Sequence, residues 1–406
     1  MKYFETTQQG RSVWWSWIFA TWIAIVIWTL GQSILIQLMT TIAGDMDPTL
    51  KSEFAEAAVN MADMGELETY TALFGTASLI AIASVMGVVA TVWLSNKYLA
   101  QKAHLDAFGG GDFKDRNNAI LALSLLTTLA IIISASIFVM AGRLLDGTYY
   151  MALMQRAMGL SPLTYSLFLL TFPVGCLGLY LMQKVIHQRS VMSLHNALSK
   201  IRWGWIFEGF VLSWLVIGTF MFLGSKLGLF EIRLNFNAQV FFSFALASLI
   251  FIPLQAGTEE IVFRGYFNQA LTHLTRNKWV AFILTSIAFM AMHLSNPEAL
   301  EGAAAGTLPI VMSGYFFFGF AMCLLVWLDD GIETAIGVHA GNNCFAAIVV
   351  NYEGSVLPTP SMFMAVPDAV SDAMSTIIIL AVIVAIIWWR RGGPSRSDDR
   401  PSIADA

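Results

Sequence analysis

Long apolar runs dominate the pattern of hydrophobic and polar positions along this chain. Each run is about 20 residues long, the length of an α-helix that crosses the hydrocarbon core of a bilayer. The pattern therefore predicts an all-α fold, a polytopic transmembrane helical bundle of about ten spans. The predicted spans lie near residues 13–43, 70–96, 118–142, 161–183, 204–224, 238–272, 278–295, 308–328, 333–351 and 369–389.

Composition supports a membrane protein and argues against several other classes. Of 406 residues, 57% are hydrophobic and 12% are charged, whereas a soluble domain usually carries about 25% charged residues. No basic stripe is dense enough to indicate a nucleic-acid partner, so the lipid bilayer is the expected environment. Cys176, Cys323 and Cys344 lie within apolar runs and lack metal-ligand spacing. We expect them to be small buried hydrophobic residues.

The distribution of lysine and arginine predicts the orientation of the spans. Cytoplasmic segments of membrane proteins carry an excess of these residues close to the spans. With both termini in the cytoplasm, 17 of the 22 basic residues lie on the inner side. Lys51, Arg143, Arg156, Lys226 and Arg233 remain outside. This bias predicts an even number of spans with both termini cytoplasmic.

The polar chemistry divides the chain into three parts. Residues 1–203 are expected to form a transmembrane block of about four spans with a cytoplasmic link at its end. For the link, from Lys184 to Trp203, a short interfacial amphipathic helix and an ordinary cytoplasmic loop both fit the sequence. Residues 204–355 contain the candidate catalytic side chains. Residues 356–406 are expected to form the last span and a disordered cytoplasmic tail.

Two adjacent glutamates and an arginine stand within a predicted span, where charge is costly and is rarely present without a function. Glu260 and Arg264 are four residues apart, so they share one face of a helix and can form an ion pair. Glu259 is turned about 100° away from Glu260. We therefore expect two carboxylates with different environments, an arrangement that allows acid and base roles to be divided.

His293 is expected to lie opposite Glu259 in a helical hairpin. The hairpin turns near Arg276, and both side chains are 17 residues from that position. In an antiparallel pair of helices, equal counts place the two residues at one level, roughly 25 Å from the turn. The equal distance of both residues from the turn therefore predicts a carboxylate beside an imidazole at membrane depth.

His339 and Asn343 are also four residues apart and share a helix face. Neutral imidazole and amide groups can each donate a hydrogen bond to a developing oxyanion in a dry site. A structural polar bridge between helices is the alternative for this pair. Gly341 between them would allow close approach of another helix.

Four other acidic residues of this region are expected to have structural roles. Asp329, Asp330 and Glu333 lie together between two predicted spans and are interpreted as a solvated turn. Glu208 is flanked by apolar residues, and we expect it to be structural or interfacial.

Three motifs in this order, EExxxR, FxxxH and HxxxN on successive apolar segments, resemble the CPBP family of CAAX prenyl endopeptidases, bacteriocin-processing proteins and Abi proteins. The resemblance covers about residues 240–350 and leaves residues 1–200 outside it. The motif positions are filled by Glu259, Glu260 and Arg264, by Phe289 and His293, and by His339 and Asn343.

The resemblance implies a role for each motif residue. Glu259 and His293 would activate the attacking water, and His339 with Asn343 would form the oxyanion hole. The second glutamate and the arginine would brace the site. The expected protein is a membrane-embedded endopeptidase of the glutamic type, and family members of this kind suggest the bacterial cytoplasmic membrane as its location. Its substrate would be a membrane-associated or lipidated peptide or protein.

Two alternatives remain open at the level of the sequence. A zinc-dependent hydrolase would use Glu259, His293 and His339 as ligands, with water in the fourth position, although the sequence has no HExxH motif that would itself require zinc. A non-catalytic membrane scaffold or immunity protein would keep the fold without the chemistry. The glutamic mechanism itself needs no cofactor.

Overall fold

The computed structural model of the chain describes residues 2–63, 149, 151–198, 200–366 and 368–393. Two of the predicted spans, near 70–96 and 118–142, and the predicted disordered tail lie outside these residues. Residues 1–51, 148–273 and 277–406 form one compact unit, and the candidate catalytic residues belong to it. The three-part division expected from the sequence stays a prediction.

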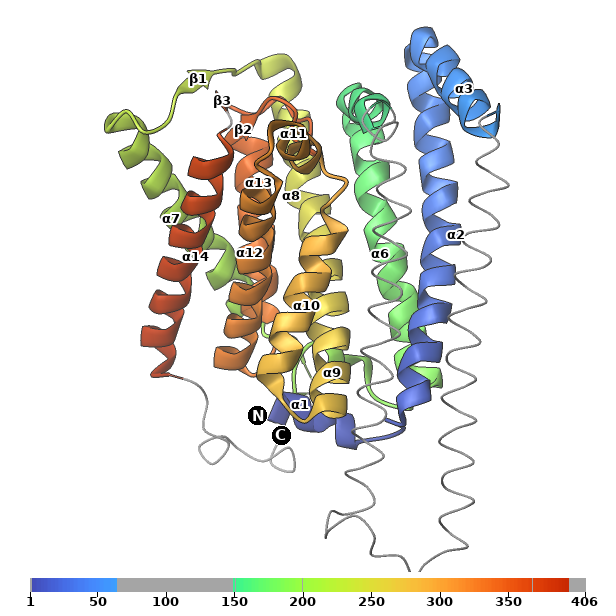
Figure 1. Cartoon of the computed structure of the whole chain (residues 1–406), viewed down its shortest axis with the longest axis vertical. Helices are drawn as coiled ribbons and strands as arrows, with labels where there is room; N and C mark the ends of the chain where they lie inside the picture. The colour runs from blue at the N-terminus through green and yellow to red at the C-terminus, as the bar shows by residue number, and fades with distance from the viewer. Residues whose placement is uncertain (1, 64–148, 150, 199, 367, 394–406) are drawn as a thin grey trace, which may run out of the picture. The chain divides into compact units, whose positions relative to one another are not determined.

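The described part is helical, as the apolar runs predict (Figure 1). The N-terminal helices are α1 (Lys2–Glu5), the 3₁₀ helix η1 (Thr6–Gln8), α2 (Trp14–Met46) and α3 (Pro48–Asp63). The middle of the chain forms α6 (Pro162–Val185), the 3₁₀ helix η2 (Val191–Leu194) and α7 (Trp203–Lys226). The site region forms α8 (Ala238–Glu260), the π-helix η3 (Ile261–Phe267), α9 (Asn268–Thr275), α10 (Lys278–Met292), α11 (Pro297–Ala305), α12 (Leu308–Asp329), α13 (Glu333–Ile348) and α14 (Ala369–Arg391).

Six helices among the described residues are long and apolar enough to cross a membrane. They are α2, α6, α7, the continuous segment Ala238–Thr275, α12 and Val370–Arg391 of α14. The bent pair α10 and α11 makes up to seven, with an angle of 87° between its two helices. The predicted span near 333–351 is the 16-residue helix α13, which lies largely buried within the bundle. The chain is thus an all-α integral membrane protein, and the count of ten spans stays a prediction.

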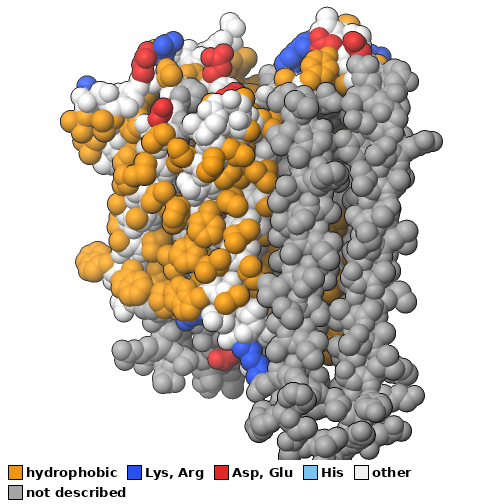
Figure 2. Space-filling view, in the orientation of Figure 1, with side chains coloured by type: hydrophobic (Ala, Val, Ile, Leu, Met, Phe, Trp, Pro, Cys, Tyr) orange, Lys and Arg blue, Asp and Glu red, His pale blue; other side chains and the backbone are white. Residues whose placement is uncertain are grey.

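One face of the bundle carries the surface expected of a lipid contact. Figure 2 shows hydrophobic side chains covering the middle of this face, with charged side chains toward its two ends. On α14 the exposed apolar residues recur every four positions, at Val370, Met374, Ile378 and Val382. Such a stripe of apolar side chains along one helix face is stable against lipid tails rather than water.

Local interactions define where the last helix, α14, begins and ends. Asp368 caps α14 by accepting a hydrogen bond of 2.7 Å from the backbone N–H of Ser371. Its hydrogen bonds from Ser371 hold the pKa of the Asp368 carboxyl below its usual value. At the other end Gly392 takes the left-handed conformation, with φ of 68°, which glycine adopts at low cost.

A small sheet joins the segments before α8 and after α13. It contains β1 (Ile232–Leu234), β2 (Val350–Tyr352) and β3 (Phe363–Ala365), in the order β1-β3-β2. Strand β3 pairs antiparallel with β1 and parallel with β2. The sequence analysis did not predict these strands, because three-residue strands carry too little alternation to be recognised.

The link between α6 and α7 is a packed layer of the fold. Neither expected form is present, because the helical part is the short η2 and the polar side chains of His187, Arg189 and His195 are buried. The His187 Nε2 atom lies 2.9 Å from the hydroxyl of Tyr266 in η3. The backbone carbonyl of Leu194 lies so close to Gly265 that an added Cβ would be 2.7 Å from it. The link therefore supports the helix that carries the glutamates.

The interpretation of Asp329, Asp330 and Glu333 as a solvated turn is wrong. Asp329 and Glu333 are completely buried, and Asp330 is 6% exposed. Arg391 at the end of α14 pairs with Asp329 at 2.9 Å, and Arg202 forms an ion pair with Glu333. Buried acids of this kind require such partners. The partners come from segments far away in the sequence, so the turn alone did not reveal them.

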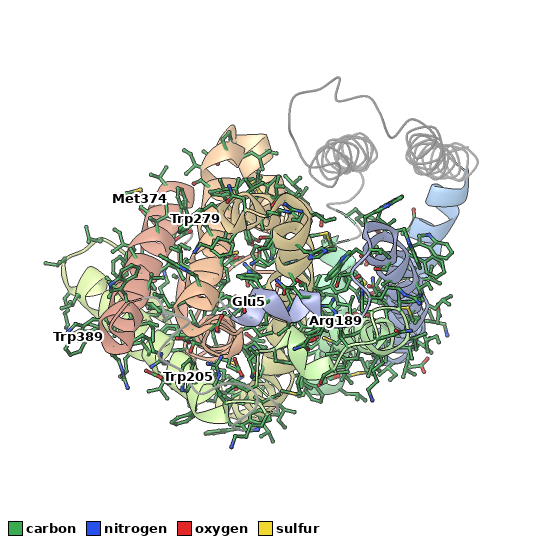
Figure 3. All side chains as sticks on the ribbon, turned by 90° about the horizontal axis from the view of Figure 1, so that it is seen from below. Glu5, Arg189, Trp205, Trp279, Met374 and Trp389 are labelled. Carbon is green, nitrogen blue, oxygen red and sulfur yellow. The ribbon has the colours of Figure 1, made fainter. Side chains whose placement is uncertain are left out.

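The described beginning and end of the chain meet at this same turn. The backbone N–H of Tyr3 donates to Oδ1 of Asp330 at 3.1 Å, next to the pair of Arg391 with Asp329. Figure 3 shows the molecule from this end, where α1 with the labelled Glu5 lies. Two ends on one side agree with an even number of spans, while their cytoplasmic location stays a prediction. Glu208 has the expected structural role, pairing with Arg391 at 2.8 Å.

Glycines allow α7 and α13 to pack closely. A Cβ on Gly337 would meet the backbone oxygen of Ile206 at 2.0 Å, and one on Gly341 would meet that of Phe210 at 2.8 Å. Close packing through small residues drives helix association in membranes, where lipid removes much of the hydrophobic driving force. The expectation for Gly341, close approach of another helix, is confirmed.

We expect Gly337→Ala to destabilise the protein because the new methyl group forces two backbones apart. Overpacking of this kind typically costs about 1–3 kcal/mol. Gly218→Ala on α7 is the matched control, since its Cβ would meet only the ring of Phe345 at 3.6 Å. Thermal unfolding of the purified protein in detergent should show a lower Tm for the first variant alone. Equal Tm values would contradict the proposed packing constraint.

Candidate active site

The two glutamates stand where a long helix changes its winding. Glu259 and Glu260 end α8, and the π-helix η3 follows at once and carries Arg264. The helix continues through α9, so the predicted single long helix is confirmed, with a π-helical stretch that the sequence did not predict. π-Helical turns within α-helices are frequent at functional sites.

Glu260 and Arg264 form the buried ion pair that their spacing predicts. Arg264 Nη1 lies 3.0 Å from Glu260 Oε1, and the two side chains are 1% and 0% exposed. Arg264 Nη2 donates to the backbone carbonyl of Gly319 in α12 at 3.1 Å. The guanidinium also lies 4.5 Å from the centre of the Phe289 ring, a cation–π contact. Glu260 is therefore the charge-compensated carboxylate of the pair.

His339 joins the two glutamates from α13. Its Nδ1 lies 2.7 Å from Glu260 Oε1, and its Nε2 lies 3.7 Å from Glu259 Oε2. An ionised carboxylate only accepts hydrogen bonds, so the short contact requires a proton on Nδ1. His339 is buried. The two ring nitrogens of His339 thus face different carboxylates, Nδ1 that of Glu260 and Nε2 that of Glu259.

Glu259 has one fixed oxygen and one that lacks a hydrogen-bond partner. Its Oε1 accepts a hydrogen bond from the side-chain amide of Gln255 one turn earlier on α8. Its Oε2 is buried and accepts no hydrogen bond from the described residues. Oε2 of Glu260 likewise accepts no hydrogen bond from the described residues, so the two carboxylates differ in what holds Oε1, which is a neutral amide for Glu259 and the guanidinium and imidazole for Glu260. The two adjacent glutamates thus differ as the helix geometry predicts.

Asn343 reaches the same group of side chains through Gln255. The Asn343 amide donates to Gln255 Oε1 at 3.3 Å and accepts from Asn342 at 3.1 Å. Gln255 thus bridges Asn343 and Glu259. The sequence analysis missed Gln255, although a polar residue four positions before Glu259 on the same helix face was a usable signal.

His293 lies at the C-terminal end of α10 and is held apart from the ion pair. Its Nδ1 lies 2.7 Å from the backbone oxygen of Phe289, which accepts the Nδ1 proton and leaves Nε2 as an acceptor. The Phe289 ring contacts both histidines, with its centre 4.5 Å from that of His293 and 6.0 Å from that of His339. The phenylalanine of the motif thus packs against both histidines.

A second polar group beside His293 was missed by the sequence analysis. It consists of Asn296, Glu298 and Tyr315, from the start of α11 and from α12. The sequence Asn296-Pro297-Glu298 was a signal for a helix start, since Pro at the first position and an acid in the first turn are typical there. That signal explains the helix but not the contact with α12.

The described residues do not gather the three ligands that a zinc site would need. No group of three His, Cys, Asp or Glu side chains among them has the geometry to hold a metal ion. Nδ1 of His339 faces Glu260 and Nδ1 of His293 faces the Phe289 carbonyl, so only the Nε2 atoms of these two candidate ligands would be available to a metal, together with Glu259. We therefore derive no catalytic step through a metal.

Comparison with known proteins supports the resemblance drawn from the motifs. Residues 238–345 match the family described as Type II CAAX prenyl endopeptidase Rce1-like. The match contains all six candidate site residues and implies a peptidase of the CAAX type that acts within the membrane.

One relative extends the similarity beyond the matched segment. The uncharacterized protein YyaK of Bacillus subtilis (strain 168) is 27% identical over 238 residues. The alignment covers 58% of this chain and 77% of that protein. No solved structure matches the chain significantly. The relative supports the family and assigns no specific activity.

We expect Arg264→Ala to be strongly destabilising, because Glu260 would remain buried without its counter-charge. Breaking a buried pair in this way typically costs about 3–5 kcal/mol. Arg233→Ala is the matched control, since the pair of Arg233 with Glu231 is 70% and 63% exposed and such pairs contribute about 0–1 kcal/mol. The measurement is the Tm and yield of purified protein. An inactive Arg264 variant with wild-type Tm would instead assign the arginine to substrate binding.

Proposed function

We propose that this protein is an intramembrane endopeptidase that uses Glu259 and His293 to activate water against a peptide bond. The observation that carries the proposal is the pair of unequal carboxylates. Oε1 of Glu260 is held by the guanidinium of Arg264 and by Nδ1 of His339. Among the described residues no lysine or arginine pairs with Glu259, whose Oε1 accepts only from the neutral Gln255 amide and whose buried Oε2 accepts no hydrogen bond. A carboxylate of this kind accepts the proton of an attacking water well.

The proposed reaction begins with proton transfer from water to Glu259. His293 offers Nε2 as a second acceptor that orients the water, because its Nδ1 proton is donated to the Phe289 carbonyl. The hydroxide oxygen then bonds to the carbonyl carbon of the substrate, whose oxygen becomes an oxyanion. The proton returns from Glu259 to the amide nitrogen as the C–N bond breaks. The products are a carboxylic acid and an amine, so atoms and charges balance.

His339 and Asn343 are proposed to stabilise the oxyanion. When His339 carries a proton on each nitrogen, Nδ1 donates to Glu260 and Nε2 is available to the oxyanion. Its charge and that of Arg264 then balance the two glutamates. The Asn343 amide, which donates to Gln255 at 3.3 Å, is the second donor. Preorganised donors in a dry site are among the largest contributions to such catalysis.

The proposed substrate class rests on the position of the site within helices long and apolar enough to cross a membrane. We propose that the peptide bond reaches Glu259 from the bilayer, within a segment of a membrane-associated or lipidated protein. A prenylated CAAX tail is the substrate that the family match favours. The bacterial cytoplasmic membrane is the proposed location, in line with the relative from Bacillus subtilis. A non-catalytic scaffold would retain the fold but would cleave nothing.

Glu259→Gln and His293→Ala should each abolish hydrolysis while the protein still inserts and purifies as folded. Removal of a general base typically lowers the rate by about 10²–10⁴. Two assays test this prediction. One measures cleavage of a farnesylated CAAX peptide by the protein in liposomes, and the other compares the termini of membrane proteins between wild-type and Glu259→Gln cells. Glu231→Gln, a change at an exposed carboxylate, is the control. Full activity in either catalytic variant would disprove the glutamic mechanism.

The glutamic mechanism also predicts that chelation leaves the reaction rate unchanged. Purified protein should contain no stoichiometric zinc by elemental analysis, and treatment with 1,10-phenanthroline should not lower kcat. The reason is that the proposed mechanism activates water with side chains alone, and no group of three His, Cys, Asp or Glu side chains among the described residues has the geometry of a metal site. Loss of activity on chelation, restored by zinc, would favour the metal-dependent alternative.

A further inference from the structure

A second polar cluster, separate from the six candidate site residues, adjoins His293. It joins the start of α11 to the middle of α12 through the side chains of Asn296, Glu298 and Tyr315. The Tyr315 hydroxyl donates to Glu298 Oε1, and the Asn296 amide donates to the Tyr315 hydroxyl at 2.8 Å and to Glu298 at 3.3 Å. The tyrosine hydroxyl is thus fixed on two sides.

The Tyr315 ring stacks on the imidazole of His293. The ring centres are 4.3 Å apart and the planes are inclined by 26°. His293 also contacts Phe289, with ring centres 4.5 Å apart. The imidazole therefore packs against two aromatic rings, one from its own helix and one from α12.

This support is needed because the backbone at His293 has left the helix. His293 is the C-cap of α10, with φ of −99° and ψ of 4°, and the chain then bends by 87° into α11. A helix end restrains a side chain less than a helix interior does. The backbone N–H of Asn296 donates to the His293 carbonyl at 3.1 Å, so Asn296 connects the histidine backbone with the hydroxyl that fixes the stacking ring.

We propose that Tyr315, held by Glu298 and Asn296, is a positioning residue that directs Nε2 of His293 toward the water activated by Glu259. The inference rests on the proposed function. A stacked aromatic face hinders rotation of the imidazole about its Cβ–Cγ bond, and the Nδ1 hydrogen bond to the Phe289 carbonyl restrains the same rotation. Misplacement of a catalytic group by about 1 Å lowers rates by roughly a hundredfold, so the ring can affect turnover without touching the substrate.

The alternative is a purely structural bridge between α11 and α12. Both roles predict some loss of stability on mutation, so stability does not separate them. A positioning role predicts in addition a fall in kcat at unchanged KM, and rescue by any residue that keeps the ring. It also predicts a spectroscopic change at His293 itself.

The test compares Tyr315→Leu with Tyr315→Phe, which retains the stacking face and removes the hydroxyl. Kinetics on the farnesylated peptide should show kcat lowered at least tenfold in Tyr315→Leu, with KM unchanged, and lowered only a few-fold in Tyr315→Phe. Glu298→Gln should resemble Tyr315→Phe because it weakens the same anchor. Tyr180→Leu is the control for loss of a tyrosine elsewhere, at a site where the hydroxyl lies 2.8 Å from His195.

An activity-independent measurement keeps the inference separate from the proposed function. In protein labelled with ¹³C-histidine and placed in nanodiscs, the His293 ring signal, assigned by its loss in His293→Gln, should be shifted upfield by Tyr315. It should move downfield and broaden in Tyr315→Leu, and stay in place in Tyr315→Phe and Tyr180→Leu. An unchanged His293 signal in Tyr315→Leu, or equal kcat in both Tyr315 variants, would overturn the inference. A shifted signal in a protein without peptidase activity would overturn the proposed function alone.

Discussion

The buried ion pair of Glu260 with Arg264 is the interaction on which the rest of the site depends. A lone charge at this depth would be too costly, because the interior offers no water to solvate it. Arg264 compensates the carboxylate and uses a further nitrogen on the carbonyl of Gly319. His339 occupies the same carboxylate oxygen from α13. One carboxylate thus fixes the relative positions of α8, α12 and α13.

This compensation also explains how two neighbouring glutamates differ in reactivity. Glu260 is paired with the Arg264 guanidinium, which favours its charged form and makes it poorly suited to accept a proton. Glu259, one residue earlier and on another side of the helix, has no lysine or arginine partner among the described residues and accepts a hydrogen bond only from the Gln255 amide. The difference arises from the helix geometry and from the partners on other helices. Separated environments for paired acids are the general condition for division of acid and base roles.

Close approach of the helices is what brings these partners within reach. Gly319 lies against Ser286, where an added Cβ would be 3.1 Å from the backbone, and Gly337 lies against the backbone of Ile206. Bulky residues at these points would move α12 away from α10 and α13 away from α7, and so displace the helices that carry the Gly319 carbonyl and His339. The close packing of the helices and the geometry of the candidate site therefore depend on each other. The contact of the Leu194 carbonyl, in the link between α6 and α7, with Gly265 of η3 is part of the same close packing.

The sequence alone determined the features that depend on local period and spacing. Apolar runs set the helices, and the spacing of four residues set the pair of Glu260 with Arg264, because both follow from the geometry of a single helix. The order of the three motifs indicated the family that the comparison then supported. The placement of Asn343 within reach of the glutamates was also predicted, although its contact runs through Gln255.

Tertiary structure decided everything that joins segments distant in the chain. It buried Asp329 and Glu333 by supplying arginines from α14 and from the link, turned the stretch after Glu260 into a π-helix, and set Tyr315 against His293. The physical reason is that burial, charge compensation and ring stacking depend on which helices become neighbours. A run of residues does not specify its neighbours, because many apolar surfaces pack almost equally well until the polar groups must be satisfied.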